Sequence, residues 1–153
     1  MIRVVDIDQE YIQEASKSMP VFNLVPNTSI NGLKLISPRT EVRKKFGSPL
    51  KSGTLRYSNG DICYYDVFNG ITVIYNHRYF SEQFQIYGGE ARINRFKIYP
   101  GTVKEFVKCF PDTYQCPDGW ISRDYSMAIK ETDGIITDLI VAYEGFYDKW
   151  WES

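Results

Sequence analysis

The chain has 153 residues, of which 43% are hydrophobic and 24% are charged, and its formal net charge is −1. This size and composition predict one folded unit with a buried core, and the nearly balanced charge argues against a dedicated nucleic-acid-binding protein. Every apolar run is shorter than the roughly 18 residues of a membrane span, and the acidic N-terminal segment is unlike a secretory signal. We therefore expect a cytoplasmic protein that binds neither nucleic acid nor membrane.

The first predicted element is a short helix over residues 8–19. Asp8 can cap it, its apolar side chains recur at helical spacing along one stripe, and Pro20 ends it. Residues 21–29 contain two asparagines and a proline, which predict an irregular connection. The alternating residues 30–36 then predict a short strand or an extended segment.

A second helix is predicted immediately afterwards. Ser37 is a candidate N-cap, Pro38 suits the first helical position, and Gly47 is a candidate C-cap. Strands should follow over residues 61–67, 71–76 and 82–87, with hairpin signals at Asn59-Gly60 and Asn69-Gly70.

The second half of the chain repeats this order. A third short helix is predicted over residues 101–111, followed by strands over 122–131 and 135–143 that Asp133-Gly134 joins as a hairpin. At an offset of 64 positions, Phe106 aligns with Val42, Phe110 with Phe46, Ile129 with Tyr65 and Gly134 with Gly70. These matches indicate an internal duplication, and the alternative is a single domain with two similar hairpins.

The predicted fold class is α+β. We expect two tandem repeats, each a short helix plus an antiparallel sheet, with adjacent or continuous sheets and the helices on one face. Residues 1–29 would form an N-terminal helix and linker, 30–90 the first repeat, and 91–153 the second repeat with an aromatic tail, all in one compact unit. The other sheet face is expected to be open to solvent or a partner. The tail, residues 146–151, is expected to fold back as a lid on the core; the alternative is an exposed end that anchors an oligomer.

One stretch resembles a known family. The residues 32–35 (GLKL) and 37–49 (SPRTEVRKKFGSP) resemble the opening of a repeat in the β-lactamase inhibitor protein-like superfamily. The resemblance implies two tandem copies of a helix and hairpin sheet, and a protein-binding module whose sheet face holds a partner. The second copy departs from the pattern, because Phe110-Pro111 lacks the glycine.

The sequence offers little for catalysis or metal binding. His77 is the only histidine, and although Cys63 could in principle meet it, we expect an exposed loop histidine and a buried cysteine. A bridge between Cys109 and Cys116 is conceivable, but free thiols are favoured in a reducing cytosol. We therefore expect no enzyme, no metal and no cofactor.

Charge and aromatic content point instead to protein binding. Basic residues gather near the two short repeat helices, whereas the chain beyond Cys109 has three basic and nine acidic residues. The hypothesis is an immunity protein that neutralises a bacterial toxin, whose basic domain the acidic half would attract. The alternative is a small-ligand-binding protein or enzyme with a pocket lined by Tyr64, Tyr65, Tyr75 and Phe84. The oligomeric state stays open. The candidate contact residues are Asp118, Trp120, Arg123, Asp124, Tyr125, Asp133, Asp138 and Tyr64.

Overall fold

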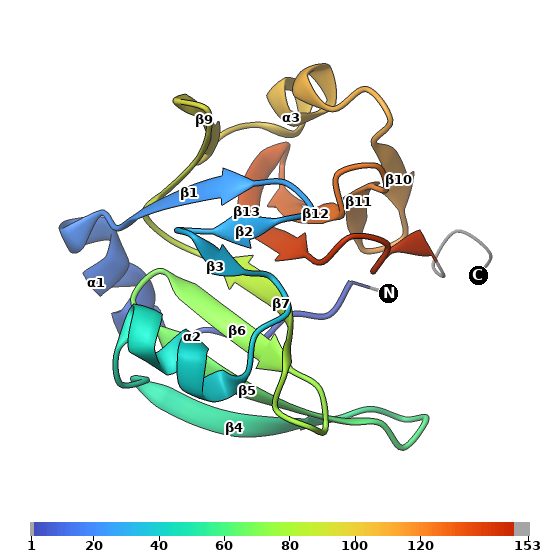
Figure 1. Cartoon of the computed structure of the whole chain (residues 1–153). Coiled ribbons are helices and arrows are strands. Elements are labelled where there is room, and N and C mark those ends of the chain that lie inside the picture. Colours follow the sequence, from blue (N-terminus) through green and yellow to red (C-terminus); the bar gives the residue numbers. More distant parts are fainter. Residues whose placement is uncertain (1, 149–153) are drawn as a thin grey trace.

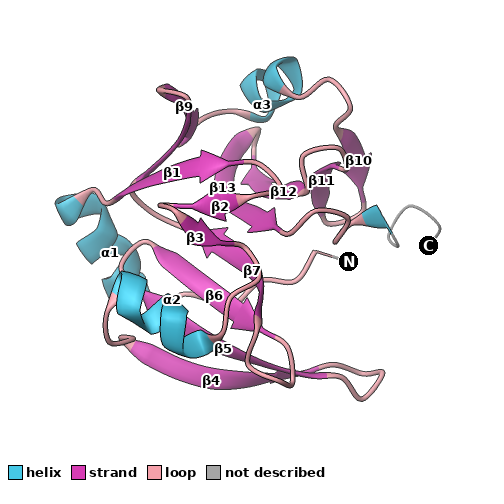
Figure 2. Ribbon diagram, in the orientation of Figure 1, coloured by secondary structure: helices cyan, strands magenta, loops and turns pink. Residues whose placement is uncertain are grey.

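The computed structural model describes residues 2–148 and has three helices and two β-sheets (Figures 1 and 2). The helices are α1 (Gln9–Ser18), α2 (Arg39–Phe46) and α3 (Val103–Cys109). The sheets contain eight and five strands, so the predicted α+β class is confirmed. Within the described part of the chain, no helix is both long and apolar enough to cross a membrane.

The larger sheet is continuous through both halves of the chain. Each half contributes an antiparallel run of four strands, and the two runs join where β13 pairs with β7. The strand order is therefore β10-β11-β12-β13-β7-β6-β5-β4. In the chain, α2 precedes β4 and α3 precedes β10, so each run of four strands follows one helix. The first run comprises β4 (Lys51–Arg56), β5 (Ile62–Phe68), β6 (Ile71–Tyr75) and β7 (Ser81–Ile86). The second run comprises β10 (Tyr114–Cys116), β11 (Gly119–Ser122), β12 (Met127–Thr132) and β13 (Ile135–Ala142).

The smaller sheet contains a strand where an irregular connection was predicted. β1 (Val21–Val25) lies parallel to β8, with Val21 opposite Glu90, so the prediction of an irregular connection was wrong for residues 21–25, whereas residues 26–28 form a turn. The partner of β1 is remote in sequence, and local composition carries no signal for such a pairing. The order is β3-β2-β1-β8-β9, with β2 (Ser29–Ile30), β3 (Leu33–Lys34), β8 (Glu90–Ile93) and β9 (Phe96–Tyr99).

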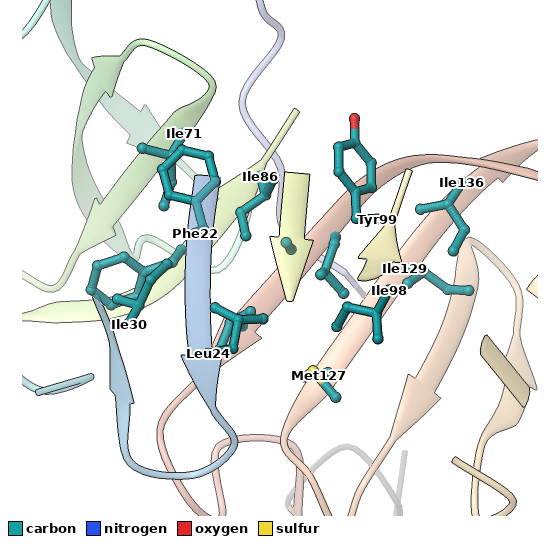
Figure 3. Close-up of a cluster of buried hydrophobic side chains, with 14 of the residues drawn as sticks. Phe22, Leu24, Ile30, Ile71, Ile86, Ile98, Tyr99, Met127, Ile129 and Ile136 are labelled. Atoms are coloured by element: carbon teal, nitrogen blue, oxygen red, sulfur yellow. The ribbon is translucent and has the colours of Figure 1, made fainter. Parts of the chain in front are cut away.

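The main hydrophobic core lies between the two sheets. Figure 3 shows side chains of β1 and β9 facing those of β6, β7, β12 and β13 across this layer. The helices α2 and α3 cover the same face of the large sheet, because Val42, Phe106 and Phe110 are buried in this core. The repeat helices therefore share one face, as predicted.

The opposite face of the large sheet is covered, contrary to the expectation of an open face. Ile2 packs with Phe146 and Tyr147 against β11–β13, and Val5 packs against β5 and β6. The helix α1 lies on this face too, where Ala15 is buried against Val67 and Tyr87. Residues 2–18 therefore contribute side chains that cover this second face of the large sheet. Phe146 and Tyr147 fold back as the lid hypothesis expected, whereas Trp150 and Trp151 lie outside the described residues.

The repeats match in topology but not at one constant offset. The helices α2 and α3 start 64 positions apart, at Arg39 and Val103. Asn69-Gly70, however, joins the second and third strands of its run, whereas Asp133-Gly134 joins the third and fourth. The predicted equivalence of these two turns was therefore wrong. The connections between strands are, taken together, shorter in the second half, so the number of positions between equivalent strands decreases along the sheet. Two hairpin turns that lie 64 positions apart are therefore not equivalent in the structure.

Two local predictions also need correction. The single strand predicted over 122–131 is interrupted by a turn, in which Ser126 has a φ of 52° and its N–H bonds the carbonyl of Arg123. The predicted N-cap Ser37 does not cap α2, because its hydroxyl donates instead to the carbonyl of Lys34 at 2.6 Å. Pro38 occupies the N-cap position and supplies no side-chain cap, whereas Gly47 ends the helix as predicted.

The helix α3, in contrast, has a complete capping box. Thr102 Oγ1 accepts a hydrogen bond from the Glu105 N–H, and Glu105 Oε1 accepts one from the Thr102 N–H, both at 3.1 Å. Thr102→Ala should therefore lower the free energy of unfolding by about 1 kcal/mol in urea denaturation. Asp8→Ala is the control, because Asp8 makes no capping hydrogen bond at α1. An equal loss in the two variants would contradict this assignment.

Candidate functional site

The residues predicted as one contact surface are distributed over the second half of the sheet. Asp118 lies in the β10–β11 turn, where Oδ2 accepts a hydrogen bond from the Ile2 N–H at 2.7 Å. Trp120 is half-buried and packs against the main core. Asp133 is exposed in the β12–β13 turn at the same end of these strands. Asp118 and Trp120 thus have structural contacts.

The remaining acidic and aromatic candidates lie elsewhere. Arg123, Asp124 and Tyr125 form the β11–β12 turn, at the other end of β11. Arg123 Nε donates to Asp148 at 3.1 Å, and Tyr125 packs edge-on against Phe110. Asp138 accepts a hydrogen bond from a buried glutamine of β7 on the face that the N-terminal segment covers. The structure does not bring these residues together into one surface.

The alternative pocket is not formed as predicted. Tyr75 and Phe84 are fully buried in the main core, and Tyr64 packs partly against it. Tyr65 packs in the clusters on the opposite face of the large sheet. The four side chains therefore do not line one cavity, because successive residues of a strand point to opposite faces.

A buried carboxylate organises the first half of the molecule. Asp66 of β5 is fully buried, and its two oxygens accept hydrogen bonds from Nε and Nη2 of Arg43, both at 2.9 Å. The hydroxyls of Ser52 and Tyr75 donate to it as well, at 2.6 and 2.9 Å. Asp66 therefore links α2 to three neighbouring strands, β4, β5 and β6. A bidentate arginine–carboxylate pair with two further donors is a strong, geometrically specific arrangement.

This environment keeps Asp66 ionised. Burial alone raises the pKa of a carboxyl group, but the hydrogen bonds from Arg43, Ser52 and Tyr75 outweigh burial and hold the pKa of Asp66 below its ordinary value of 3.8. The hydrogen bond with Asp66 correspondingly raises the pKa of Arg43. Burial, and then the charge of Asp66, raise the pKa of Tyr75, whose phenol stays protonated as a donor. The cluster is therefore structural, with a fixed charge.

The same helix carries a second arginine to the surface. Arg39 lies one turn before Arg43, and its Nε is 3.8 Å from Asp66 Oδ2. Its guanidinium lies over the ring of Tyr79, 4.9 Å from the ring centroid. Tyr79 in turn stacks on Tyr64 with centroids 4.4 Å apart. Arg39, Tyr79 and Tyr64 thus form a continuous stack above the buried Asp66 cluster.

The loop that holds Tyr79 is rigidly built. Asn76 Oδ1 accepts hydrogen bonds from the N–H groups of Arg78 and Phe80, at 2.9 and 3.1 Å. The Tyr79 carbonyl also accepts a hydrogen bond from the Arg39 N–H at 2.9 Å. Tyr79 itself has a φ of 65°, a left-handed conformation that is unfavourable for a bulky residue. Such strain persists where the surrounding structure enforces it, and it is commonly found at functional sites.

Tyr79 is the centre of an exposed aromatic and apolar surface. We call this surface the Tyr79 patch; it comprises Ile36, Arg39, Tyr64, Arg78, Tyr79 and Phe80. Ile36 is 56% exposed, and Tyr79 and Phe80 are each 41% exposed. The backbone pairing of Pro38 with Phe80 brings the segment before α2 against the β6–β7 loop, so these residues are neighbours. Beside them is a hollow of about 400 Å³ lined by Pro38, Arg39, Thr40, Arg43, Arg78 and Tyr79.

A second hollow gathers the two residues considered for nucleophilic catalysis. Cys63 and His77 line a space of about 500 Å³ with Arg3, Asp61 and Glu82 among its other residues. Burial raises the pKa of the Cys63 thiol, which disfavours the reactive thiolate. Cys63 is buried and His77 is exposed, as predicted. Among residues 2–148, no group of three or more His, Cys, Asp or Glu side chains is placed to hold a metal ion.

Sequence reasoning found Tyr64 but missed the rest of the Tyr79 patch. One available signal was Asp66, a lone acidic residue in the apolar run of residues 62–68. Another was the four-residue spacing of Arg39 and Arg43, which places both on one face of a helix. The left-handed conformation of Tyr79 has no comparable sequence signal. Comparisons with family models, curated proteins and solved structures found no match to this chain.

Proposed function

We propose that this protein acts by binding another protein, as a cytoplasmic immunity protein does when it blocks a toxin. The observation that carries this proposal is the Tyr79 patch, where the exposed Tyr79 ring is held against Arg39 and Tyr64 by side chains of its own fold. Tyrosine and arginine are enriched among the residues that contribute most to protein interfaces. A rigid, preformed surface also lowers the entropic cost of association.

The covered faces of the large sheet bear on where such a partner would bind. The resemblance to the inhibitor superfamily implied contact through a sheet face, but residues 2–7, α1 and the segment 146–147 cover the face expected to be open. The other face forms the main core. The loop end around Tyr79 is therefore the surface we propose for contact. The two helix-and-four-strand runs support the tandem arrangement that the resemblance implies.

Replacing Tyr79 by glycine is expected to weaken partner binding while leaving the stability of the fold nearly unchanged. Glycine adopts a φ of 65° without strain, which offsets the lost stacking on Tyr64 and Arg39. The free energy of unfolding should therefore change by less than about 1 kcal/mol. Affinity for the partner should fall by about 30-fold or more, as expected for a central aromatic contact.

The measurement begins with a tagged pull-down from the native host at low and then moderate salt. The captured protein is purified, and its dissociation constant is measured by calorimetry for the wild type and for Tyr79→Gly. Phe96→Ala is the matched control, because Phe96 is 76% exposed and the β8–β9 hairpin is remote from the β6–β7 loop (Figure 1). Co-expression with the partner then tests whether the wild type, but not Tyr79→Gly, protects cells from growth arrest.

Other outcomes would contradict specific parts of this proposal. If Tyr79→Gly binds as tightly as the wild type, the partner contacts another surface. Asp124→Asn then tests the predicted acidic surface, because the Asp124 side chain is exposed. If the pull-down captures no partner and a metabolite raises the melting temperature of the protein, the small-ligand alternative is favoured.

A further inference from the structure

The hollow beside the Tyr79 patch carries an excess of positive charge. Arg39, Arg43 and Arg78 contribute to its wall, and among residues 2–148 no acidic side chain lines it. Arg43 makes the bidentate contact with Asp66, and the single negative charge of that carboxylate is shared with Arg39. Arg39 is 3.8 Å from the same carboxylate, and Arg78 has no ion-pair partner among the residues that the structure describes.

The start of α2 adds to this positive potential. Pro38 at the N-cap position lines the hollow and supplies no side-chain acceptor to the first turn. The acidic residue of that turn, Glu41, pairs with Lys44 at 3.2 Å and is not part of the lining. The positive end of the helix dipole therefore reinforces the field of the arginines at this point.

The surroundings of the hollow are apolar. Tyr79 forms part of its wall, and Ile36 and Phe80 are exposed on the adjoining surface. A ligand that matches this arrangement has one negative group for the arginines and apolar groups beside it. An acidic side chain next to an apolar side chain on a protein surface has this chemistry, whereas a nucleic acid backbone presents a row of charges to a chain whose net charge is −1.

We infer that the hollow receives an aspartate or glutamate side chain of the partner protein, flanked by an apolar residue that packs on Phe80 or Ile36. This inference rests on the proposed function and specifies the chemistry of the partner. It departs from the sequence-based hypothesis of a basic partner, because the exposed charges at the Tyr79 patch are arginines. Arg39 and Arg78 would bind the carboxylate, and Arg43 would hold the wall in place through Asp66.

The test uses the full chain and a library of random linear peptides. Peptides are selected on the wild type, and the most enriched one is synthesised in its acidic form and with each Asp or Glu replaced by the corresponding amide. Binding of both forms is measured by fluorescence anisotropy to the wild type and to Arg39→Gln/Arg78→Gln. Lys104→Gln is the control, because Lys104 is exposed on α3 and does not line the hollow.

We expect enriched peptides to contain an acidic residue next to an apolar one. The double arginine variant and the amide form should each weaken binding at least about tenfold, and their effects should not add when combined, because both remove the same contact. Lys104→Gln should bind as the wild type does.

Several results would overturn the inference. These are the absence of any enriched peptide, enrichment without acidic residues, or acidic peptides that bind the double arginine variant unchanged. A phosphoserine form that binds more than tenfold tighter than the acidic form would assign the hollow to a phosphorylated ligand. If the captured partner depends on Tyr79 but not on the arginines, the proposed function stands and this inference fails. If acidic peptides bind the hollow but the captured partner binds Tyr79→Gly as tightly as the wild type, the hollow recognises acidic side chains, and the Tyr79 patch is not the surface that this partner contacts.

Discussion

Replacing Asp66 by asparagine is expected to lower the free energy of unfolding by about 3–5 kcal/mol. The substitution removes the charge that Arg43 faces at 2.9 Å and presents an amide N–H₂ to groups that are themselves donors. Asparagine keeps one carbonyl oxygen, so one of the two hydroxyls, that of Ser52 at Oδ1 or that of Tyr75 at Oδ2, would lose its acceptor as well. Tyr75 is fully buried, so its hydroxyl has no water to replace the lost partner.

The control is the same chemical change at an exposed position. Asp133→Asn lies in the β12–β13 turn, where φ is 52° and asparagine is well tolerated, so the change should stay within about 0.5 kcal/mol. Urea denaturation followed by circular dichroism measures both variants. A loss below about 1 kcal/mol for Asp66→Asn would show that the buried cluster contributes little to stability.

Comparing the stability of Asp66→Asn with that of the wild type at several pH values measures how much Asp66 contributes to acid unfolding. The folded-state pKa of Asp66 is lowered from 3.8, so its stabilising contribution is complete above that value. It is lost as the pH falls below 3.8 and through the folded-state pKa. The difference in stability between wild type and Asp66→Asn should therefore be constant from pH 7 to about 5 and should shrink in more acidic solution. Parallel stability curves down to pH 2 would contradict this assignment.

Replacing Gln85 by leucine is expected to lower the free energy of unfolding by about 2–4 kcal/mol. The Gln85 amide is buried and pairs with the backbone of Val5 in both directions, accepting from N–H at 2.8 Å and donating to C=O at 2.9 Å. It also donates to Asp138 at 3.0 Å. Leucine leaves the buried N–H and C=O of Val5 without partners, so the segment that covers the sheet should detach first.

Two measurements distinguish this local effect from general loss of packing. Limited proteolysis should cut residues 2–7 in Gln85→Leu under conditions in which the wild type resists cleavage. Gln13→Leu makes the same substitution on the exposed side of α1, and it should leave both stability and cleavage unchanged. If Gln85→Leu loses stability without cleavage near Val5, the N-terminal segment is held by its apolar contacts rather than by Gln85.

The elements that the sequence predicted well are those with local signals. Pro20 and Gly47 mark helix ends, and Asn69-Gly70 and Asp133-Gly134 mark hairpin turns, because each acts through the backbone of its own residues. The strand β4 was missed, since its residues 51–56 are mostly polar and form the edge of the sheet. Non-local pairing and edge position leave little trace in composition.

The sequence by itself determined the α+β class, the helices, three of the hairpin turns and the repetition of a helix followed by antiparallel strands. These features follow from local backbone preferences and hydrophobic periodicity. Only the tertiary structure decided that β1 pairs with β8, that residues 2–7 cover the sheet, and that Asp66 meets Arg43. The candidate site belongs to this second group, because Arg39, Tyr64 and Tyr79 come from separate segments. These residues come together through packing and long-range hydrogen bonds. The local conformational preferences of the individual residues do not predict such contacts.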